Sequence, residues 1–326
     1  MKVAVLGAGA WGTALGLVLH RRLHDVVLWG HDAGHLQEMQ KSGRNERYLP
    51  GVDLPRDWTF EPDMTRAVAD ASCAVVAVPS KAMRAATKAL VNYSGTVVSV
   101  TKGIEHETGL TMCGVLQANA PKASVVALSG PTLALEVARG VPSAIVAAHR
   151  DSALAQSIQQ LFHNVTFRVY TSTDLIGVEM GGALKNVVAI AAGVGDGLGF
   201  GDNSKAALLT RGIVEIRRLG VACGAQPETF AGLSGLGDLT VTCFSRLSRN
   251  RGLGERLGRG EKLEAILAAS VTVAEGYPTA RAAYQLARKL DVSTPIIDEV
   301  YAVLYEGKNV AQALRDLVSR ESRAEN

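Results

Sequence analysis

The chain has 326 residues, of which 47% are hydrophobic and 20% are charged, and its formal net charge at pH 7 is +3. This composition excludes an intrinsically disordered chain, and the length allows two domains with a sizeable core. The small net charge gives no reason to expect a nucleic-acid partner.

The chain begins with a predicted strand, a glycine-rich turn and a helix. The apolar run 3–6 is typical of a strand buried on both faces of a parallel sheet. Gly7, Gly9 and Gly12 follow with the spacing G-x-G-x-x-G, and a helix is expected from near Trp11. These glycines permit a tight turn, close approach of a pyrophosphate and close helix packing, and the helix N-terminus offers free N–H groups. We therefore predict a dinucleotide-binding unit here, with an ordinary tight turn as the alternative.

Strands continue to alternate with helices up to about residue 174. Further strands are expected at 26–29, 73–78, 96–100, 124–128, 144–148 and, at a sheet edge, 166–170. Helices are expected at 32–43, 65–70, 81–92, 111–120 and 152–162, and 49–55 is expected to be a loop. This alternation predicts an α/β fold with a mostly parallel, doubly wound sheet in a first domain, residues 1–175.

The remainder, residues 176–326, is predicted to be an all-helical domain. Apolar residues recur at helical spacing over 208–219, 284–290 and 297–304, and 187–192 is expected to be the core of a long buried helix. Glycine-rich loops are expected at 193–201 and 232–237, and a frayed polar tail at 319–326.

Three features predict a cytoplasmic protein without a membrane anchor. The four cysteines are far apart and have no C-x-x-C spacing, which favours reduced thiols. The first residues enter a strand directly, without a signal segment. The longest apolar runs fall short of the ~18 residues that a membrane span needs.

The end of the second strand bears on the choice of nicotinamide cofactor. An acidic residue there usually binds the ribose 2′-hydroxyl of NAD, but this position is Gly30. His31 can donate to a 2′-phosphate, and Asp32 comes too late to occupy the usual acidic position. We therefore predict NADPH, or tolerance of both cofactors. The alternative is that His31 is only a solvated loop residue.

Lys185 and Asn186 interrupt an otherwise apolar predicted helix. Lysine is seldom buried without a reason. Burial, together with a second cation such as Lys102 nearby, would lower the pKa of Lys185 and make it a usable proton donor and acceptor. The alternative is a lysine whose amine reaches the surface.

Two further segments carry candidate chemistry in the second half. Asp238 could orient a lysine, accept from a substrate hydroxyl or cap a helix. Arg249 lies at an expected helix start, where a guanidinium can bind a phosphate through two parallel hydrogen bonds. A solvated basic turn is the alternative. In the first half, 101–103 and 129–132 follow strands at the sheet edge where such folds bind ligands.

From about residue 2 to residue 317, the chain resembles the bacterial NAD(P)-dependent glycerol-3-phosphate dehydrogenase family. The motifs that carry the resemblance are GAGAWGTAL at 7–15, LWGHD at 28–32, TKGIE at 101–105, SGPT at 129–132, GGALKNV at 181–187, GLGDL at 235–239, SRN at 248–250 and EGY at 275–277. The resemblance implies a Rossmann-type domain followed by a helical domain like that of 6-phosphogluconate dehydrogenase. It also implies reduction of dihydroxyacetone phosphate to sn-glycerol 3-phosphate, for phospholipid synthesis.

The resemblance also implies the roles of individual residues, with Lys185 as the catalytic acid and base. The implied substrate contacts are Lys102, Gly130, Thr132, Lys185, Asn186, Asp238, Ser248, Arg249 and Asn250. The implied cofactor contacts are Gly7, Gly9, Ala10, Trp11, Gly12, His31, Lys102, Ala134, Arg249, Val273 and Glu275. The cofactor is expected to be NADP or NAD, with NADPH favoured. No metal site is predicted, and a homodimer is expected.

Two other functions remain as alternatives. A β-hydroxyacid dehydrogenase of the same superfamily would also place a lysine on a helix of its second domain, but we find no glycine-rich substrate motif of that kind. A redox-sensing module that binds NADPH without chemistry would keep the glycine turn. It would not need Lys185, Asn186, Asp238 and Arg249 together.

Overall fold

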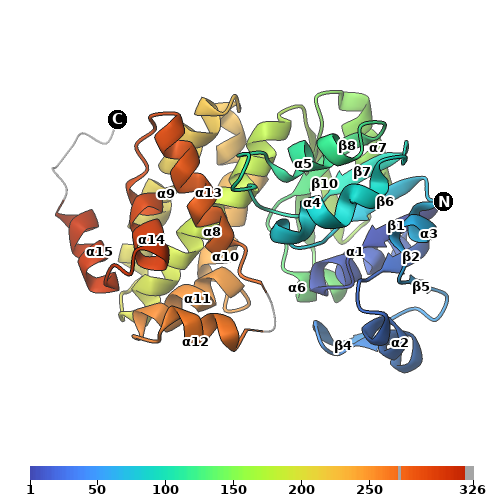
Figure 1. Ribbon diagram of the computed structural model, residues 1–326, viewed down its shortest axis with the longest axis horizontal. Helices are drawn as coiled ribbons and strands as arrows, with labels where there is room; N and C mark the ends of the chain where they lie inside the picture. Colours follow the sequence, from blue (N-terminus) through green and yellow to red (C-terminus); the bar gives the residue numbers. More distant parts are fainter. Residues whose placement is uncertain (271–272, 320–326) are drawn as a thin grey trace.

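The computed structural model describes residues 1–270 and 273–319 of the chain. Figure 1 shows two lobes side by side, one built around a sheet and the other from helices. Residues 320–326 of the expected polar tail lie outside the described residues.

The first lobe is organised by a sheet that has eight strands within the described residues, in the order β10-β9-β8-β7-β6-β1-β2-β5. Its strands are β1 (Lys2–Leu6), β2 (Asp25–Trp29), β5 (Thr59–Glu61), β6 (Cys73–Val76), β7 (Thr96–Ser99), β8 (Ser124–Ser129), β9 (Ser143–Ala148) and β10 (Phe167–Ser172). All neighbours are parallel except β8 and β9. The predicted parallel, doubly wound sheet and its edge strand are confirmed. The order reverses at β1, where such folds form a ligand crevice.

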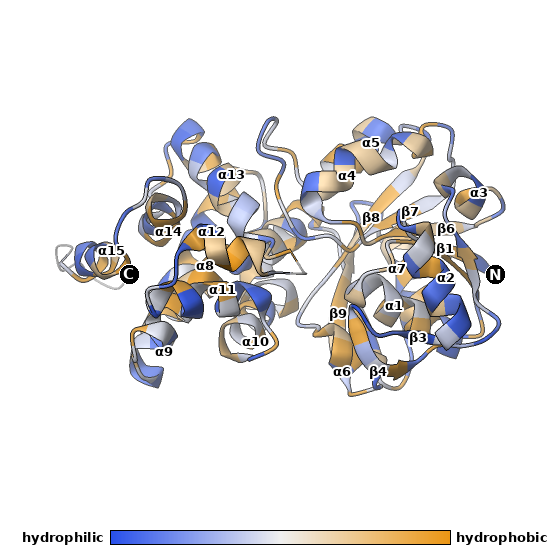
Figure 2. Cartoon of the chain, turned by 60° about the horizontal axis from the view of Figure 1, so that its bottom comes forward, coloured by the Kyte–Doolittle hydropathy of each residue, from blue (hydrophilic) through white to orange (hydrophobic). Residues whose placement is uncertain are grey.

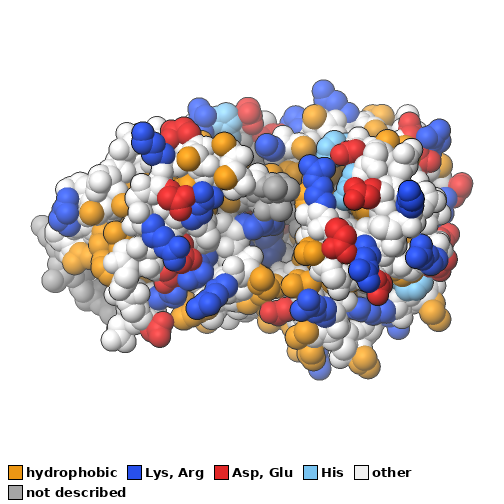
Figure 3. Space-filling model, turned by 90° about the horizontal axis from the view of Figure 1, so that it is seen from below, with side chains coloured by type: hydrophobic (Ala, Val, Ile, Leu, Met, Phe, Trp, Pro, Cys, Tyr) orange, Lys and Arg blue, Asp and Glu red, His pale blue; other side chains and the backbone are white. Residues whose placement is uncertain are grey.

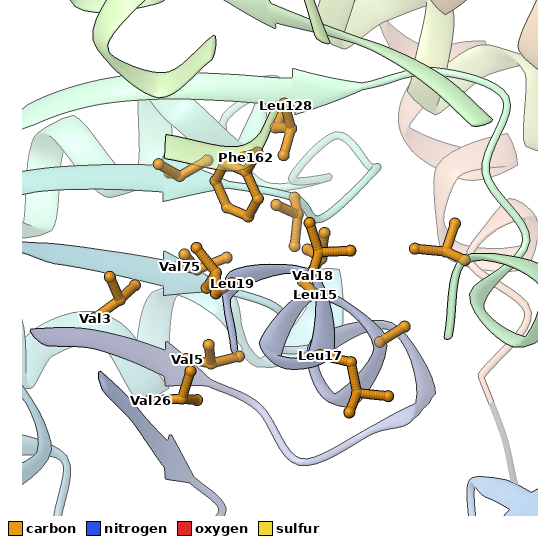
Figure 4. Packing of buried hydrophobic residues seen from close by; sticks show 14 of the residues in the cluster. Val3, Val5, Leu15, Leu17, Val18, Leu19, Val26, Val75, Leu128 and Phe162 are labelled. Carbon is orange, nitrogen blue, oxygen red and sulfur yellow. The ribbon is translucent and has the colours of Figure 1, made fainter. Parts of the chain in front are cut away.

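Alternate residues of the central strand enter two different cores. Val3 and Val5 of β1 pack with Leu15 and Val18 of α1 (Ala10–Arg21), as Figure 4 shows. The intervening residues of β1 belong to the core on the other face of the sheet. Figure 2 shows hydrophobic residues along the strands and hydrophilic residues on outer helices such as α2 (Ala33–Ser42). The sheet is thus buried on both faces, which explains its continuous apolar strands.

The other helices of this lobe are α3 (Met64–Val68), α4 (Met83–Ala86), α5 (Met112–Asn119), α6 (Ala134–Ala138) and α7 (Ser152–Phe162). The single helix expected over 81–92 was wrong, because α4 lies between the 3-10 helices Ser80–Ala82 and Thr87–Leu90. The amide of Asn119 donates to the carbonyl of Arg84 at 2.7 Å, which takes the acceptor that a continuous helix would use.

Sequence reasoning also missed short elements near the edge of the sheet. The expected loop 49–55 contains β4 (Leu49–Asp53), which pairs with β3 (Arg44–Asn45), and β5 and α6 were not expected. Pro50, Gly51 and Pro55 are typical of turns, so nothing in the sequence indicated the strand β4. The hairpin that contains β4 is also held by a contact with a distant residue. That contact is made by Asn45, which is fully buried and donates to the carbonyl of Ala8.

The second lobe is helical, as predicted, and is built around α8 (Leu175–Gly197). This helix packs against α9 (Asp202–Ala222), α10 (Asp238–Phe244), α11 (Arg249–Gly258), α13 (Gly276–Lys289) and α14 (Pro295–Tyr305). α12 (Leu263–Ala268) and α15 (Val310–Val318) lie further out in Figure 1. The expected core at 187–192 is confirmed, since these residues are buried in α8.

Three expectations about glycines and apolar runs were wrong in whole or in part. Of the expected loop 193–201, residues 193–197 belong to α8 and only 198–201 form a loop. Gly193 and Gly197 lie within α8, and added Cβ atoms would lie 2.0 and 2.3 Å from carbonyl oxygens of α11, so these glycines allow the two helices to pack closely. The segment Leu233–Gly237 is a π-helical turn. α8 is long and apolar enough to cross a membrane, although we expected no such run, but 78% of its apolar window is buried inside the protein. Its composition therefore fits a core helix.

Candidate active site

The glycine-rich turn between β1 and α1 has the shape that a pyrophosphate requires. Gly7 has φ +138°, and a Cβ there would lie 2.6 Å from the carbonyl oxygen of Ala77. A Cβ on Gly12 would lie 1.9 Å from the carbonyl oxygen of Gly7. By contrast, among the described residues beyond Gly9 and its two chain neighbours, no atom lies within 4 Å of the position that a Cβ on Gly9 would take. The turn is therefore closed toward the protein and open above Gly9, at the N-terminus of α1.

Lys185 and Asp238 form a buried ion pair between α8 and α10. Lys185 is 6% exposed and Asp238 is 1% exposed, and the Lys185 Nζ lies 2.9 Å from the Asp238 Oδ1. The Asp238 Oδ2 lies 2.5 Å from the Nζ of Lys102, which follows β7 in the sheet lobe. One carboxylate thus bridges two ammonium groups, one from each lobe. The predicted burial of Lys185 beside Lys102 is confirmed, and the surface alternative was wrong.

The surroundings of Lys185 set its protonation. Burial lowers the pKa of its ammonium to about 8, because a charge is costly away from water. Asp238 opposes this shift by stabilising the cation, and Lys102 adds to it by repulsion. An amine with a pKa in this range can give and take a proton near neutral pH.

A pH profile measured in both directions tests this property. If the ammonium of Lys185 is the acid, ketone reduction should keep its full rate below about pH 8 and slow above it. Alcohol oxidation needs the neutral amine, so its rate should rise as the pH increases toward about 8. The measurement is kcat/KM from pH 6 to 10 for each direction. The same pH dependence in both directions would contradict an acid and base with this pKa.

Sequence reasoning assigned no role to Thr242, which contacts the amine directly. The Nζ of Lys185 donates to the Thr242 Oγ1 at 2.5 Å, and that hydroxyl donates to the backbone carbonyl of Asp238 at 2.7 Å. Thr242 lies one helical turn after Asp238 on α10, so both face the same side. This i, i+4 spacing was the available signal, but it has meaning only once Lys185 is known to lie opposite.

Two hydrogen-bonded asparagines, Asn186 and Asn250, connect three helices beside the ion pair. The Asn250 amide donates to the Asn186 Oδ1 at 2.8 Å, and the backbone N–H of Gly276 donates to the Asn250 Oδ1 at 2.8 Å. Ser248 caps α11 by accepting from the Arg251 N–H at 3.2 Å, so the predicted helix start is confirmed. These two hydrogen bonds hold the N-termini of α11 and α13 against α8.

The strand-end segment after β8 meets Lys102. The Lys102 Nζ donates to the carbonyl of Gly130 at 3.0 Å, and the Thr132 hydroxyl donates to the same carbonyl at 3.2 Å. Lys102 therefore contacts one group from the sheet lobe and Asp238 from the helical lobe. These contacts place the 129–132 segment next to the two lysines.

Glu275 and Arg249 lie on the helical side of the boundary between the lobes. The Glu275 carboxylate accepts from the backbone N–H of Ser80 at 3.1 Å and from the Ser80 hydroxyl, so it joins the lobes. Arg249 is exposed, yet the protein around it lowers the pKa of its guanidinium, an effect that Glu275 opposes. Figure 3 shows a hollow between the lobes with Lys and Arg side chains along it.

The remaining predicted contacts lie at the edges of this arrangement. Ala10 and Trp11 open α1 and are partly buried, Ala134 opens α6, and Val273 is partly buried. His31 is exposed just after β2. Among residues 1–270 and 273–319, no hydrogen bond joins the side chain of His31 to Lys102, Lys185 or Asp238.

Family models match both halves of the chain. Residues 2–155 match the NAD-dependent glycerol-3-phosphate dehydrogenase N-terminus, and residues 174–315 match the C-terminus. A glycerol-3-phosphate dehydrogenase [NAD(P)+] of Desulfotalea psychrophila is 46% identical, covering 99% of this chain and 98% of its own. The chain belongs to the NAD-dependent glycerol-3-phosphate dehydrogenase family.

Other members of the glycerol-3-phosphate dehydrogenase family agree over the full length. A Chlorobium phaeobacteroides relative with the same name is 47% identical, covering 100% of this chain and 99% of its own. The crystal structure of a Coxiella burnetii glycerol-3-phosphate dehydrogenase superposes with a TM-score of 0.94 at 36% identity, covering 98% of this chain and 99% of that one. The resemblance noted from the motifs is confirmed, as is the fold class.

The residues present fit the dinucleotide that this dehydrogenase family uses. The open space above Gly9 and the uncapped N-terminus of α1 suit a pyrophosphate. The reversal of strand order at β1 places this turn at the crevice where Rossmann-type sheets bind nucleotides. This member of the glycerol-3-phosphate dehydrogenase family thus combines an open glycine-rich turn with a buried Lys185 and a partly buried Lys102.

Proposed function

We propose that this chain catalyses the NAD(P)H-dependent reduction of dihydroxyacetone phosphate to sn-glycerol 3-phosphate, and the reverse oxidation. One observation carries the proposal: the buried amine of Lys185 lies 2.9 Å from Asp238, which also binds Lys102 of the other lobe. The nicotinamide, when bound, supplies or accepts the hydride. Proton transfer, stabilisation of the alkoxide and substrate binding are carried out by the protein's own side chains.

Lys185 is the proposed acid and base. In reduction, its ammonium donates a proton to the alkoxide that develops on the substrate, and its positive charge stabilises that alkoxide as it forms. Asp238 and Thr242 fix the direction of the amine, because both contact the Lys185 Nζ from one face of α10. In oxidation, the neutral amine takes the hydroxyl proton.

Arg249 is the proposed anchor for the substrate phosphate. Arg249 is an exposed residue at the N-terminus of α11, a helix of 10 residues whose first N–H groups favour an anion. The other proposed substrate contacts are Lys102, Gly130, Thr132, Lys185, Asn186, Asp238, Ser248 and Asn250. Lys102 and Arg249 also belong to the proposed cofactor contacts, with Gly7, Gly9, Ala10, Trp11, Gly12, His31, Ala134, Val273 and Glu275.

Replacing Arg249 by alanine should raise KM for dihydroxyacetone phosphate about 10- to 100-fold, the effect of losing charge-assisted hydrogen bonds. The measurement is steady-state kinetics at saturating NADPH. Arg246→Ala is the matched control, because Arg246 is also exposed in the segment that precedes α11. An unchanged KM in Arg249→Ala, or an equal rise in both variants, would remove Arg249 from this role.

The absorbance of NADPH at saturating dihydroxyacetone phosphate tests the function itself. Substrate-dependent loss of absorbance supports it. A β-hydroxyacid dehydrogenase would instead consume NADPH with a keto acid, and a redox-sensing module would consume it with neither substrate. Either of those results would overturn the proposal.

Several broader properties belong to the same proposal. We propose a dinucleotide-binding domain at 1–175 and a catalytic helical domain at 176–326, NADPH as the favoured cofactor, cytoplasmic location and supply of glycerol 3-phosphate for phospholipid synthesis. A homodimer is supported by exposed large apolar side chains on the helical lobe, such as Phe200, Phe244 and Leu247. Sedimentation equilibrium tests the dimer.

A further inference from the structure

We propose that Asp32 and Arg47 together let the nucleotide site accept both NADH and NADPH, with Asp32 binding the ribose 2′-hydroxyl of NADH and Arg47 binding the 2′-phosphate of NADPH. The inference rests on the proposed function for its choice of cofactor. Its test is a binding measurement that needs no turnover, so the two can fail separately.

The usual position for choosing between these cofactors is a glycine in crowded surroundings, Gly30. A Cβ on Gly30 would lie 3.1 Å from the Ala8 Cβ and 3.1 Å from the Leu36 Cδ2. Both atoms belong to packed core residues, so a side chain at this position would have to shift them by a few tenths of an ångström, and Gly30 itself offers no carboxylate. The choice must therefore be made by side chains that reach this place from elsewhere.

Asp32 is the carboxylate that follows Gly30 in the chain by two residues. It is the N-cap of α2, and its Oδ1 accepts from the backbone N–H of His35 at 3.0 Å. That hydrogen bond, and to a lesser degree the charge of Arg47, lower the pKa of the Asp32 carboxyl. Asp32 is thus an anion at neutral pH with one oxygen held by the helix and the other directed to Arg47.

Arg47 reaches the same place from a different segment of the chain. Asn45 anchors this segment to the glycine turn, because its buried amide donates to the Ala8 carbonyl at 3.0 Å and to the Thr13 hydroxyl at 2.8 Å. The Arg47 guanidinium then lies over the ring of Tyr48, 5.1 Å from its centroid. The cation is therefore positioned relative to the nucleotide turn by a buried contact.

The Asp32–Arg47 pair is weak enough to be opened by a ligand. The Arg47 Nη1 lies 3.4 Å from the Asp32 Oδ2, and the two side chains are 51% and 45% exposed. Exposed pairs of this kind contribute little to stability, so a 2′-phosphate can take the guanidinium at small cost. A phosphate offers Arg47 two parallel hydrogen bonds, whereas a 2′-hydroxyl can donate to Asp32 instead.

Calorimetric titration with two nucleotides tests the proposal. Adenosine 2′,5′-bisphosphate carries the 2′-phosphate of NADPH, and adenosine 5′-monophosphate carries the 2′-hydroxyl of NADH. Arg47→Gln should weaken binding of the bisphosphate about 10- to 100-fold and leave binding of the monophosphate within about twofold. Asp32→Asn keeps a good N-cap residue. It should weaken the monophosphate and tighten the bisphosphate, because a like charge is removed.

Arg44→Gln is the matched control. Arg44 lies on the same hairpin, is 50% exposed and forms its own ion pair with Asp53 at 2.7 Å. Unchanged binding of both nucleotides in Arg44→Gln is expected. An equal loss for both nucleotides in Arg47→Gln would mean that Arg47 only holds the turn, and no change would mean that it does not meet the phosphate. Either outcome overturns the proposal, whether or not dihydroxyacetone phosphate is reduced.

Discussion

Lys185→Ala is expected to lower kcat for dihydroxyacetone phosphate reduction about 10²- to 10⁴-fold, the usual contribution of a positioned general acid. The amine lies between Asp238 and Thr242, and no other ammonium contacts both groups among the described residues. The glycine turn is untouched by this change, so the Kd for NADPH should stay nearly the same. Stopped-flow turnover and fluorescence titration of NADPH measure the two quantities on one sample.

The control for Lys185→Ala is Lys205→Ala. Lys205 is another largely buried lysine of the helical lobe, and its Nζ lies 2.6 Å from Asp196 instead of pairing with Asp238. Its removal should reduce stability without a comparable loss of kcat. Full activity in Lys185→Ala would remove this residue from the acid and base role, and an equal loss of kcat in both variants would show that the effect comes from the fold.

Asp238→Asn is expected to have the second-largest effect. The carboxylate bridges the Nζ atoms of Lys185 and Lys102, so its loss leaves two confined cations without their counter-charge. Removing one partner of a buried ion pair costs about 3–5 kcal/mol of unfolding free energy. Because Asp238 holds the pKa of Lys185 up, that pKa should also fall, and the amine should lose its proton at neutral pH.

The pH profile separates these two consequences. Reduction by Asp238→Asn should be slow at pH 8 and partly recover toward pH 6, where the amine is protonated again. Asp196→Asn is the matched control, since Asp196 likewise bridges two cations, Lys205 and Arg251, both at 2.6 Å. It should lower the free energy of unfolding in urea but leave the pH profile unchanged. A profile in Asp238→Asn that matches the unaltered protein would show that Asp238 does not tune Lys185.

The sequence by itself determined those structural elements that depend only on residues close together in the chain. The spacing of Gly7, Gly9 and Gly12 after an apolar strand predicts the cofactor turn, because Gly7 and Gly12 leave no room for a side chain and Gly9 leaves open space beside the backbone. Alternation of apolar strands with helices predicts the parallel sheet. A lysine in an apolar helix predicts its own burial, since α8 buries nearly every face around Lys185.

Only the tertiary structure decided what lies opposite these elements. Whether Asp238 meets Lys185, Lys102 or a helix N–H depends on how α10 packs across α8 and the sheet lobe, and Thr242 gains its role by the same packing. Asn119 interrupts the helix near Arg84 from a distant part of the chain. Gly193 lies inside α8, where the absence of a side chain lets α11 pack closely against it. In each case the deciding partner is far away in the sequence, so local pattern carries no information about it.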